Sequence, residues 1–270
     1  MFRRSLTLKL PRVQVVRPLA RRLTTAVASR PQKVTWTTTA ALTLTGLGIY
    51  GLNYAYAEAP AYAGSVEDPT TKLSFPIFLN TNNEWKRLIG LGVRTVTFLK
   101  MNVYVLGMYM KNDDIEALKA KKGWKNVDKE QFLEKSELAE ELLNQPYDVS
   151  IRLVPVRATS TQHLRDGFLR LLMQRMKDQS LTEDEEREIL RAMQEFKSNF
   201  VSMNVKKDSE FIFTKTQDGL RISYEGKDWG IVQNAWLAKN FIMGYLEPKH
   251  PSSEAALHDI AQGLEKLMKE

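Results

Sequence analysis

Hydrophobic and polar residues alternate along this chain with two different periods. A period of two, typical of strands, runs through residues 90–99, 102–110, 147–155, 210–215 and 220–225. A period of three to four residues predicts helices over residues 113–122, 129–143, 161–177, 231–245 and 253–269, and one more helix that begins after Thr182. Strands and helices therefore come in groups rather than in a regular strand–helix repeat.

Two local signals support this assignment. Glu185 follows Thr182 at the spacing of a capping box, in which each side chain accepts a hydrogen bond from the other residue's backbone N–H. Gln-Asp-Gly at residues 217–219 is a turn signal between two alternating segments and predicts a β-hairpin. Such pairings favour the α+β class, an antiparallel sheet with helices packed on one face. No glycine-rich loop follows a strand, so the sequence does not support a P-loop or Rossmann nucleotide fold.

An arginine interrupts the apolar face of the first predicted strand. Alternation places Arg94 on the same face as Val96 and Phe98. A guanidinium stays charged in proteins, so in this position it needs an anionic partner. The partner is either a carboxylate of the protein, such as Asp166 or Glu195, or an anionic ligand.

The basic character of the chain is confined to its N-terminus. The formal net charge is +7, and nine Lys and Arg residues precede the first acid, Glu58. The rest of the chain carries 30 Lys and Arg against 32 Asp and Glu, so the charge gives no reason to expect a nucleic-acid partner. Residues 1–34 have the acid-free, Arg- and Ser-rich composition of a mitochondrial targeting peptide; a disordered basic tail is the alternative.

A stretch without charge follows the basic leader. Residues 36–56 are long enough to cross a bilayer as a helix and carry aromatic residues at both ends, which predicts a transmembrane or arrest segment. Cations precede this segment and acids follow it, so we expect an inner-membrane location with the folded part facing the intermembrane space. Residues 57–68 have the composition of a linker, and residues 69–270 are expected to form one globular domain.

Candidate metal chemistry is sparse. The chain has no cysteine, which excludes disulfides, thiolate nucleophiles and Cys-based metal sites. The three histidines, His163, His250 and His258, lack the spacing of metal ligands, so we expect no metal site.

Gly92-Val93-Arg94, followed by an aromatic-rich strand that ends Gly107-Met108-Tyr109, resembles the chalcone isomerase fold. With the leader, the chain is similar to the fungal mitochondrial members of that family, the altered inheritance of mitochondria group. The resemblance implies an open-faced sandwich, an antiparallel sheet with helices packed on one face and a ligand cleft between them. Plant members use the arginine to stabilise an enolate during an intramolecular Michael addition, other branches use it to hold a fatty acid, and a haem-binding role has been proposed for fungal members.

The family's site residues carry over only in part. The arginine falls on Arg94, and the second-strand threonine falls on Tyr104. The tyrosine and asparagine of the cleft helix should lie within 157–178, which contains neither residue type and offers His163 among other polar residues. The Thr or Ser near the C-terminus has no counterpart in 234–247. Because the cation is kept without its polar partners, we expect efficient isomerisation to be absent.

Two classes of function remain open. One is a non-enzymatic binding protein for an apolar ligand with an anionic head, either haem or a fatty acid, bound by Arg94. Tyr104 would share the cleft or pack as a core aromatic, and His163 would serve as a haem ligand, as a base, or only as a capping or surface residue. The other class is an intramolecular lyase or isomerase acting on an enone. An assembly factor with a vestigial cleft is a third interpretation.

Overall fold

The protein was analysed as a computed structural model, which describes residues 64–96 and 101–270. The predicted targeting peptide (1–34) and the uncharged segment (36–56) lie outside the described residues, as does Phe98. Within the part of the chain that the structure describes, no helix is long and apolar enough to cross a membrane.

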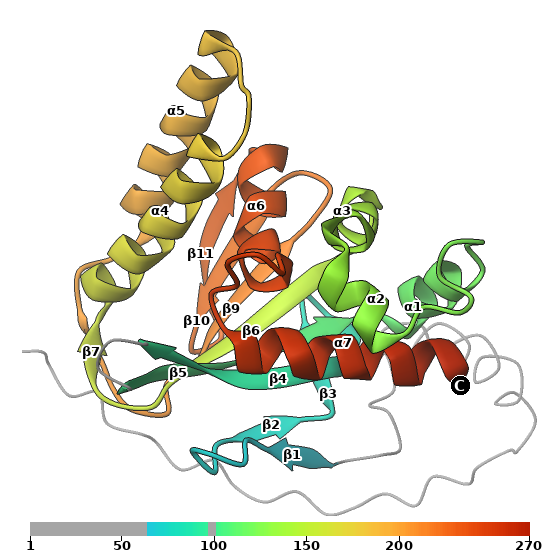
Figure 1. The fold of residues 1–270 in the computed structure, drawn as a ribbon. Helices are drawn as coiled ribbons and strands as arrows, with labels where there is room; N and C mark the ends of the chain where they lie inside the picture. The colour runs from blue at the N-terminus through green and yellow to red at the C-terminus, as the bar shows by residue number, and fades with distance from the viewer. Residues whose placement is uncertain (1–63, 97–100) are drawn as a thin grey trace, which may run out of the picture. The chain divides into compact units, whose positions relative to one another are not determined.

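A seven-stranded antiparallel sheet forms the centre of the domain (Figure 1). Its strand order is β11-β10-β9-β6-β5-β4-β3, so most neighbours in the sheet are also neighbours in sequence. Such local pairing is what the hairpin signals predicted. The bounds are β3 (Phe78–Thr81), β4 (Glu84–Val96), β5 (Met101–Met110), β6 (Val149–Pro155), β9 (Phe211–Lys215), β10 (Leu220–Tyr224) and β11 (Lys227–Val232).

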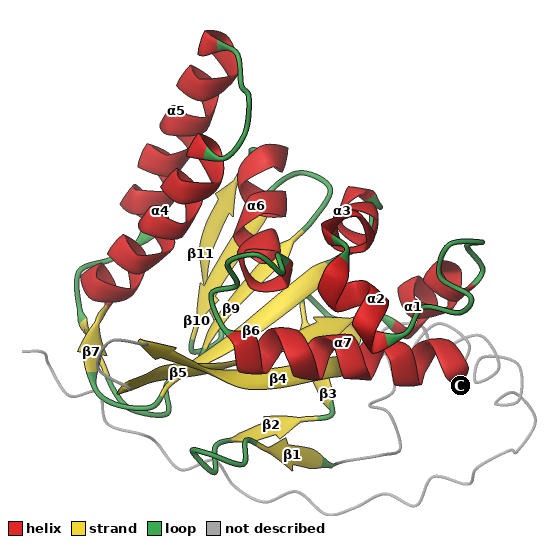
Figure 2. Ribbon diagram, in the orientation of Figure 1, coloured by secondary structure: helices red, strands yellow, loops and turns green. Residues whose placement is uncertain are grey.

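Helices gather on one face of this sheet (Figure 2). Together with the inner strand positions they enclose the main core, which contains the predicted inward residues Val149, Ile151 and Leu153. The bounds are α1 (Asn112–Lys119), α2 (Lys129–Glu134), α3 (Ser136–Asn144), α4 (Thr161–Lys177), α5 (Glu183–Asn199), α6 (Ala235–Leu246) and α7 (Glu254–Lys269). The arrangement confirms the predicted α+β open-faced sandwich.

The opposite face of the sheet is covered by a hairpin that the sequence did not reveal. Strands β1 (Ser65–Glu67) and β2 (Ser74–Pro76) pair with each other, and Phe75 of β2 is fully buried in a second, smaller core. The Tyr109 hydroxyl on the sheet donates to the Pro76 carbonyl at 3.0 Å and fastens the hairpin. Strand β1 lies inside the range expected to be a linker. A two-stranded pairing of β7 (Thr159–Ser160) and β8 (Asn204–Val205) completes the strands.

Two of the predicted helices differ from the observed elements. The single helix predicted over 129–143 is two helices, because Lys135 adopts an extended backbone conformation between α2 and α3. The helix predicted over 231–245 begins later, since Lys227–Val232 pairs with β10 as strand β11 and Asn234 caps α6 by accepting from the Leu237 N–H. In the second case, strand pairing outweighs the local apolar pattern.

The capping box is confirmed. The Thr182 hydroxyl accepts from the Glu185 N–H at 3.3 Å, and the Glu185 carboxylate accepts from the Thr182 N–H at 2.8 Å. Helix α5 therefore starts where the sequence predicted.

The core under α4 and α6 is a cluster of aromatic rings. Phe168 on α4 lies at its centre, with ring centroids 5.1 Å from Phe213 and 5.4 Å from Phe241. Phe168 also lies within 6.3 Å of the Tyr104 ring on β5. The position near Phe241 that carries a Thr or Ser in chalcone isomerases is therefore part of the packed interior here.

Candidate functional site

Glycines in β4 bring helix α7 directly against the strand that carries Arg94. Positions 90, 92 and 94 share the inner face of β4, and the first two are glycines. A Cβ atom on Gly92 would lie 2.3 Å from the Ala256 backbone nitrogen, and one on Gly90 would lie 2.6 Å from the Asp259 carbonyl carbon. Only residues without a side chain allow this approach, which places the start of α7 beside Arg94.

Side chains of α7 also bond to the backbone of β4. Strand β3 pairs with β4 only as far as Arg87. The backbone N–H and carbonyl groups along the rest of that edge of β4 therefore need other hydrogen-bond partners. The Leu91 N–H donates to the Asp259 carboxylate at 2.8 Å. The Ser253 hydroxyl donates to the Val93 carbonyl at 2.7 Å and caps α7 by accepting from the Ala256 N–H. These bonds fix the end of β4 and the helix start as one unit.

Arg94 and Tyr104 face each other across the β4–β5 pair. They are direct antiparallel partners, so their side chains share one face of the sheet. The Arg94 Nη1 atom donates to the Tyr104 hydroxyl at 3.4 Å, and the guanidinium carbon lies 5.8 Å from the Tyr104 ring centroid. Tyr104 is only 3% exposed, whereas Arg94 is half-buried. The pKa of Arg94 is raised, chiefly by Tyr104, so its charge is kept despite burial.

A second tyrosine extends this contact into the core. The Tyr245 hydroxyl on α6 lies 2.8 Å from the Tyr104 hydroxyl, and Tyr245 is fully buried. Burial raises the pKa of Tyr245 well above its ordinary value, so its hydroxyl stays protonated. Sequence reasoning missed Tyr245 because the family pattern places a Ser or Thr in segment 234–247, where this chain carries a tyrosine.

No carboxylate of the described residues neutralises Arg94. Within residues 64–96 and 101–270, no Asp or Glu oxygen lies within the 4.0 Å limit of an ion pair to its guanidinium. Asp166, one of the two acids considered from the sequence, instead pairs with Arg165 at 2.7 Å. Glu195, the other, is exposed on α5. An internal ion pair is therefore not what holds Arg94 on this face.

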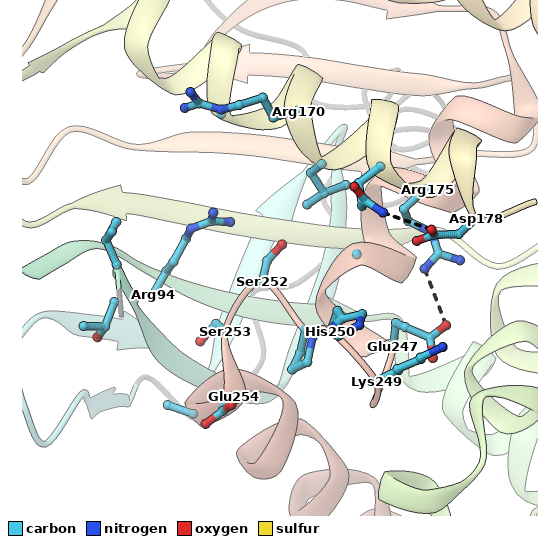
Figure 3. A pocket seen from close by; sticks show the side chains of 18 of the residues that line it. Arg94, Arg170, Arg175, Asp178, Glu247, Lys249, His250, Ser252, Ser253 and Glu254 are labelled. Atoms are coloured by element: carbon cyan, nitrogen blue, oxygen red, sulfur yellow. Dashed lines mark hydrogen bonds and ion pairs between the residues drawn. The ribbon is translucent and has the colours of Figure 1, made fainter. Parts of the chain in front are cut away.

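Arg94 lines a cavity of about 990 Å³. One wall is the end of β4, Val93–Val96. A second wall is the face of α4 that carries Gly167, Arg170 and Arg175. The loop between α6 and α7 forms the third side of the cavity. In Figure 3 the Arg94 side chain points from the strand toward α4, with Arg170 on the helix beyond it. The volume lies within the range of about 300–1,000 Å³ typical of small-molecule sites.

At the other end of the cavity, Arg175 is paired with an acid. Arg175 contacts the Glu247 carboxylate at 3.4 Å and donates to the Asn240 side-chain oxygen at 2.8 Å. Figure 3 shows Arg175, Glu247 and Lys249 together, away from Arg94. Arg94, Arg170 and Lys249 line the cavity without an ion pair to any described residue, so an acidic ligand group would meet cations that no acid of this part of the chain neutralises.

The structure separates His163 from the other two predicted site residues. Arg94 and Tyr104 come together, but the His163 side chain is exposed at the start of α4 and is not among the residues that line the cavity. Its backbone N–H donates to the capping Ser160 hydroxyl at 3.2 Å. Among the histidines of the described residues, His250 on the α6–α7 loop is the one that lines the cavity. The described residues hold no cluster of His, Asp and Glu able to bind a metal ion.

Comparison with protein families identifies the fold. Residues 84–261 match the family described as chalcone isomerase like. The chain belongs to the chalcone isomerase-like family. The resemblance inferred from Gly92-Val93-Arg94 and the strand that follows is thereby confirmed.

Several fungal proteins are similar to this member of the family. An uncharacterized protein of Schizosaccharomyces pombe is 27% identical over 256 residues, which cover 90% of this chain and 92% of that protein. The Debaryomyces hansenii protein named altered inheritance of mitochondria protein 18, mitochondrial, is 29% identical over 199 residues, covering 65% of this chain and 64% of the relative. A Saccharomyces cerevisiae protein of the same name is 24% identical over 229 residues, covering 73% of this chain and 70% of the relative.

A solved structure shares the fold. The crystal structure of a fatty-acid binding protein of Arabidopsis thaliana superposes with a TM-score of 0.61. The match covers 77% of this chain and all of that chain, at 23% sequence identity. At this identity the likeness establishes the architecture, which agrees with the open-faced sandwich described above.

Proposed function

We propose that this chain binds an apolar ligand with an anionic head, a long-chain fatty acid, and holds its carboxylate at Arg94. One observation carries the proposal: a charged guanidinium points into a cavity of about 990 Å³ with no carboxylate of the described residues to neutralise it. A planar guanidinium matches a carboxylate through two parallel hydrogen bonds. The buried Tyr104 hydroxyl accepts a hydrogen bond from the guanidinium and helps to hold it in place.

Part of the cavity wall is apolar and offers surface for an acyl chain. Val96 and Leu171 contribute that surface, whereas most of the other lining residues are polar or charged. Val96 is 39% exposed and is therefore accessible to an acyl chain. That a protein of the same architecture is named for fatty-acid binding supports this ligand class.

Haem is the second candidate ligand. Arg94 would take one of its propionates, and the cavity offers His250 as the histidine for the iron. His250 is exposed on a loop, and His163 lies outside the cavity, so the described residues provide no buried histidine for the iron at this cavity. We therefore favour the fatty acid.

Mass spectrometry of what co-purifies with the full-length chain tests the ligand class. We expect long-chain carboxylic acids in an organic extract, in near-stoichiometric amount, and no Soret band in the absorption spectrum. An intense Soret band together with bound iron would identify haem, and not a fatty acid, as the ligand. Absence of both from repeated preparations, together with no binding of added palmitate, would refute the proposal.

If the protein is instead an isomerase, Arg94 must stabilise the enolate formed during the reaction. Arg94 could stabilise an enolate, but in this chain the residues expected to position the substrate are a tyrosine at position 104 and packed aromatics on α6. We expect a chalcone to cyclise at the same rate with and without the protein. Turnover that disappears in Arg94→Ala would favour the enzyme.

We also propose a location. Relatives named mitochondrial, the acid-free leader and the uncharged segment support import into mitochondria and attachment at the inner membrane, with the domain in the intermembrane space. Protease added after rupture of the outer membrane should digest the domain. Digestion only after the inner membrane is opened would place the domain in the matrix.

A further inference from the structure

The β7–β8 pair and the adjoining ends of β4 and β5 lie together at one end of the domain (Figure 1). Val96 and Met101 pair where β4 ends and β5 begins, and the Met101 sulfur accepts from Arg157, which precedes β7. The Thr161 hydroxyl, directly after β7, donates to the Val201 carbonyl at 2.7 Å. We call this surface the β7–β8 end. Its exposed members are Val96, Arg157, Val201, Met203, Lys206 and Lys207.

Most of the exposed large apolar side chains gather at the β7–β8 end. Five such side chains are exposed among the described residues, and three of them belong here: Val201 (61% exposed), Val96 (39%) and Met203 (38%). The other two, Val66 and Leu190, lie apart from this end on β1 and α5. Single exposed apolar residues are common, whereas their concentration at one place marks an interaction surface.

Cations accompany these apolar side chains. Arg157 precedes β7, Lys206 and Lys207 follow β8, and all three are exposed. No Asp or Glu in the part of the chain that the structure describes forms an ion pair with any of them. Segments 157–160 and 201–208 contain these three cations and one acid, Asp208. The β7–β8 end is therefore positive, although acids slightly outnumber cations in the chain beyond its basic leader.

We propose that the β7–β8 end docks on the surface of a bilayer that contains anionic lipids. Charge complementarity selects this partner, because cations beside exposed apolar side chains are the combination that an anionic lipid surface binds. Val201 and Met203 enter the boundary between head groups and acyl chains. Arg157, Lys206 and Lys207 contact the lipid phosphates.

Val96 joins the docking surface to the cavity. It is exposed at the β7–β8 end and also lines the cavity that contains Arg94. A long acyl chain is far more stable in a bilayer than in water, so a docked domain takes up its ligand where that ligand is concentrated. This use of the surface rests on the proposed function, whereas the lipid contact itself rests on the surface residues alone.

Single cysteines can report the contact, because the chain has no cysteine of its own. Met203→Cys and Leu190→Cys place an environment-sensitive fluorophore at two exposed apolar positions, one at the β7–β8 end and one on α5. The full-length chain is reconstituted into vesicles of an equimolar mixture of phosphatidylcholine and phosphatidylserine. The label at position 203 should emit at shorter wavelength and be quenched by brominated acyl chains, and the label at position 190 should do neither.

The comparison within one chain separates docking from simple attachment. Attachment through another segment brings both labels near the bilayer alike, so equal emission and quenching at positions 203 and 190 would overturn the proposal. In vesicles of phosphatidylcholine alone the response at position 203 should be lost. A response that needs an added membrane protein and does not occur with lipid alone would replace the lipid surface by a protein partner.

Charge reversal tests the role of the lysines. Lys206→Glu with Lys207→Glu, made in the Met203→Cys protein, should abolish the response at position 203. Each cation near an anionic surface contributes about 5-fold to binding, so the loss of two weakens docking at least about 25-fold. Lys121→Glu with Lys122→Glu is the matched control, since these residues follow α1, far from β7 (Figure 1). Equal loss in both variants would make net charge the cause and overturn the proposal.

Palmitate binding separates this proposal from the proposed function. Lys206 and Lys207 do not line the cavity, so their double variant should bind palmitate with wild-type affinity in the absence of vesicles. The same variant should take up palmitate from the anionic vesicles at least about 10-fold more slowly than wild type, as expected when docking precedes uptake. Palmitate binding without the lipid contact at position 203 would refute docking alone. Lipid contact in a wild-type chain that binds no palmitate would refute the proposed function and leave the docking surface in place.

Discussion

Arg94→Ala should lower the affinity for palmitate by about 10- to 150-fold, or ~1.5–3 kcal/mol, the scale of a hydrogen-bonded charged group. The fold should remain nearly as stable as wild type. The reason is that no carboxylate of the described residues is paired with Arg94, so its removal leaves no unpaired acid in the protein. Calorimetric titration and thermal unfolding of the same variant measure both quantities.

Arg175→Ala serves as the control for this variant. Arg175 lines the same cavity, but it is bonded to Glu247 and to the buried Asn240. Its loss should lower the melting temperature and change palmitate affinity little. A strongly lowered melting temperature in Arg94→Ala with unchanged affinity would make Arg94 a structural residue instead.

Gly92→Ala should destabilise the protein by about 3 kcal/mol, the upper part of the range for overpacked sites. The added Cβ would lie 2.3 Å from the Ala256 backbone nitrogen, and backbone atoms of a helix cannot rotate out of its way. Helix α7 would have to shift, which would strain the bonds from Ser253 to Val93 and from Leu91 to Asp259. Urea denaturation gives the free energy of unfolding.

Gly167→Ala makes the same chemical change where the structure leaves room. Gly167 lies inside helix α4, and no atom would come within 4 Å of the added Cβ. Alanine is the better helix former, so this variant should be more stable than wild type by about 0.5–1 kcal/mol. Gly92→Ala and Gly167→Ala of equal stability would show that α7 is not seated on β4 as described.

Local sequence patterns were sufficient for much of the fold. The β4–β5 hairpin, the start of α5 at its capping box and the β9–β10 hairpin depend on residues close together in the chain, and all three were predicted. The alternation in β4 also placed Arg94 on the face that meets the helices. The assignment to the α+β class followed from these local pairings.

Contacts between distant residues could not be predicted in the same way. Tyr104 and Tyr245 are 141 positions apart, and nothing in either segment names the other as its partner. Gly90 and Gly92 have the pattern of ordinary strand glycines until β4 and α7 are seen in contact. Strand β11 was not predicted, and its last two residues were included in the following helix, because its pairing with β10 is not visible in the local apolar pattern.

Carbon-13 NMR of palmitate labelled at its carboxyl carbon tests most directly whether Arg94 holds an acid head group. Bound to the wild-type chain, the carboxyl resonance should stay that of the ionised form well below the pH at which free fatty acid protonates, because a neighbouring guanidinium favours the carboxylate. In Arg94→Ala the remaining bound signal should titrate like an ordinary carboxyl group. A bound resonance with the same titration curve in both proteins would contradict the account, since the carboxylate would then lie away from Arg94.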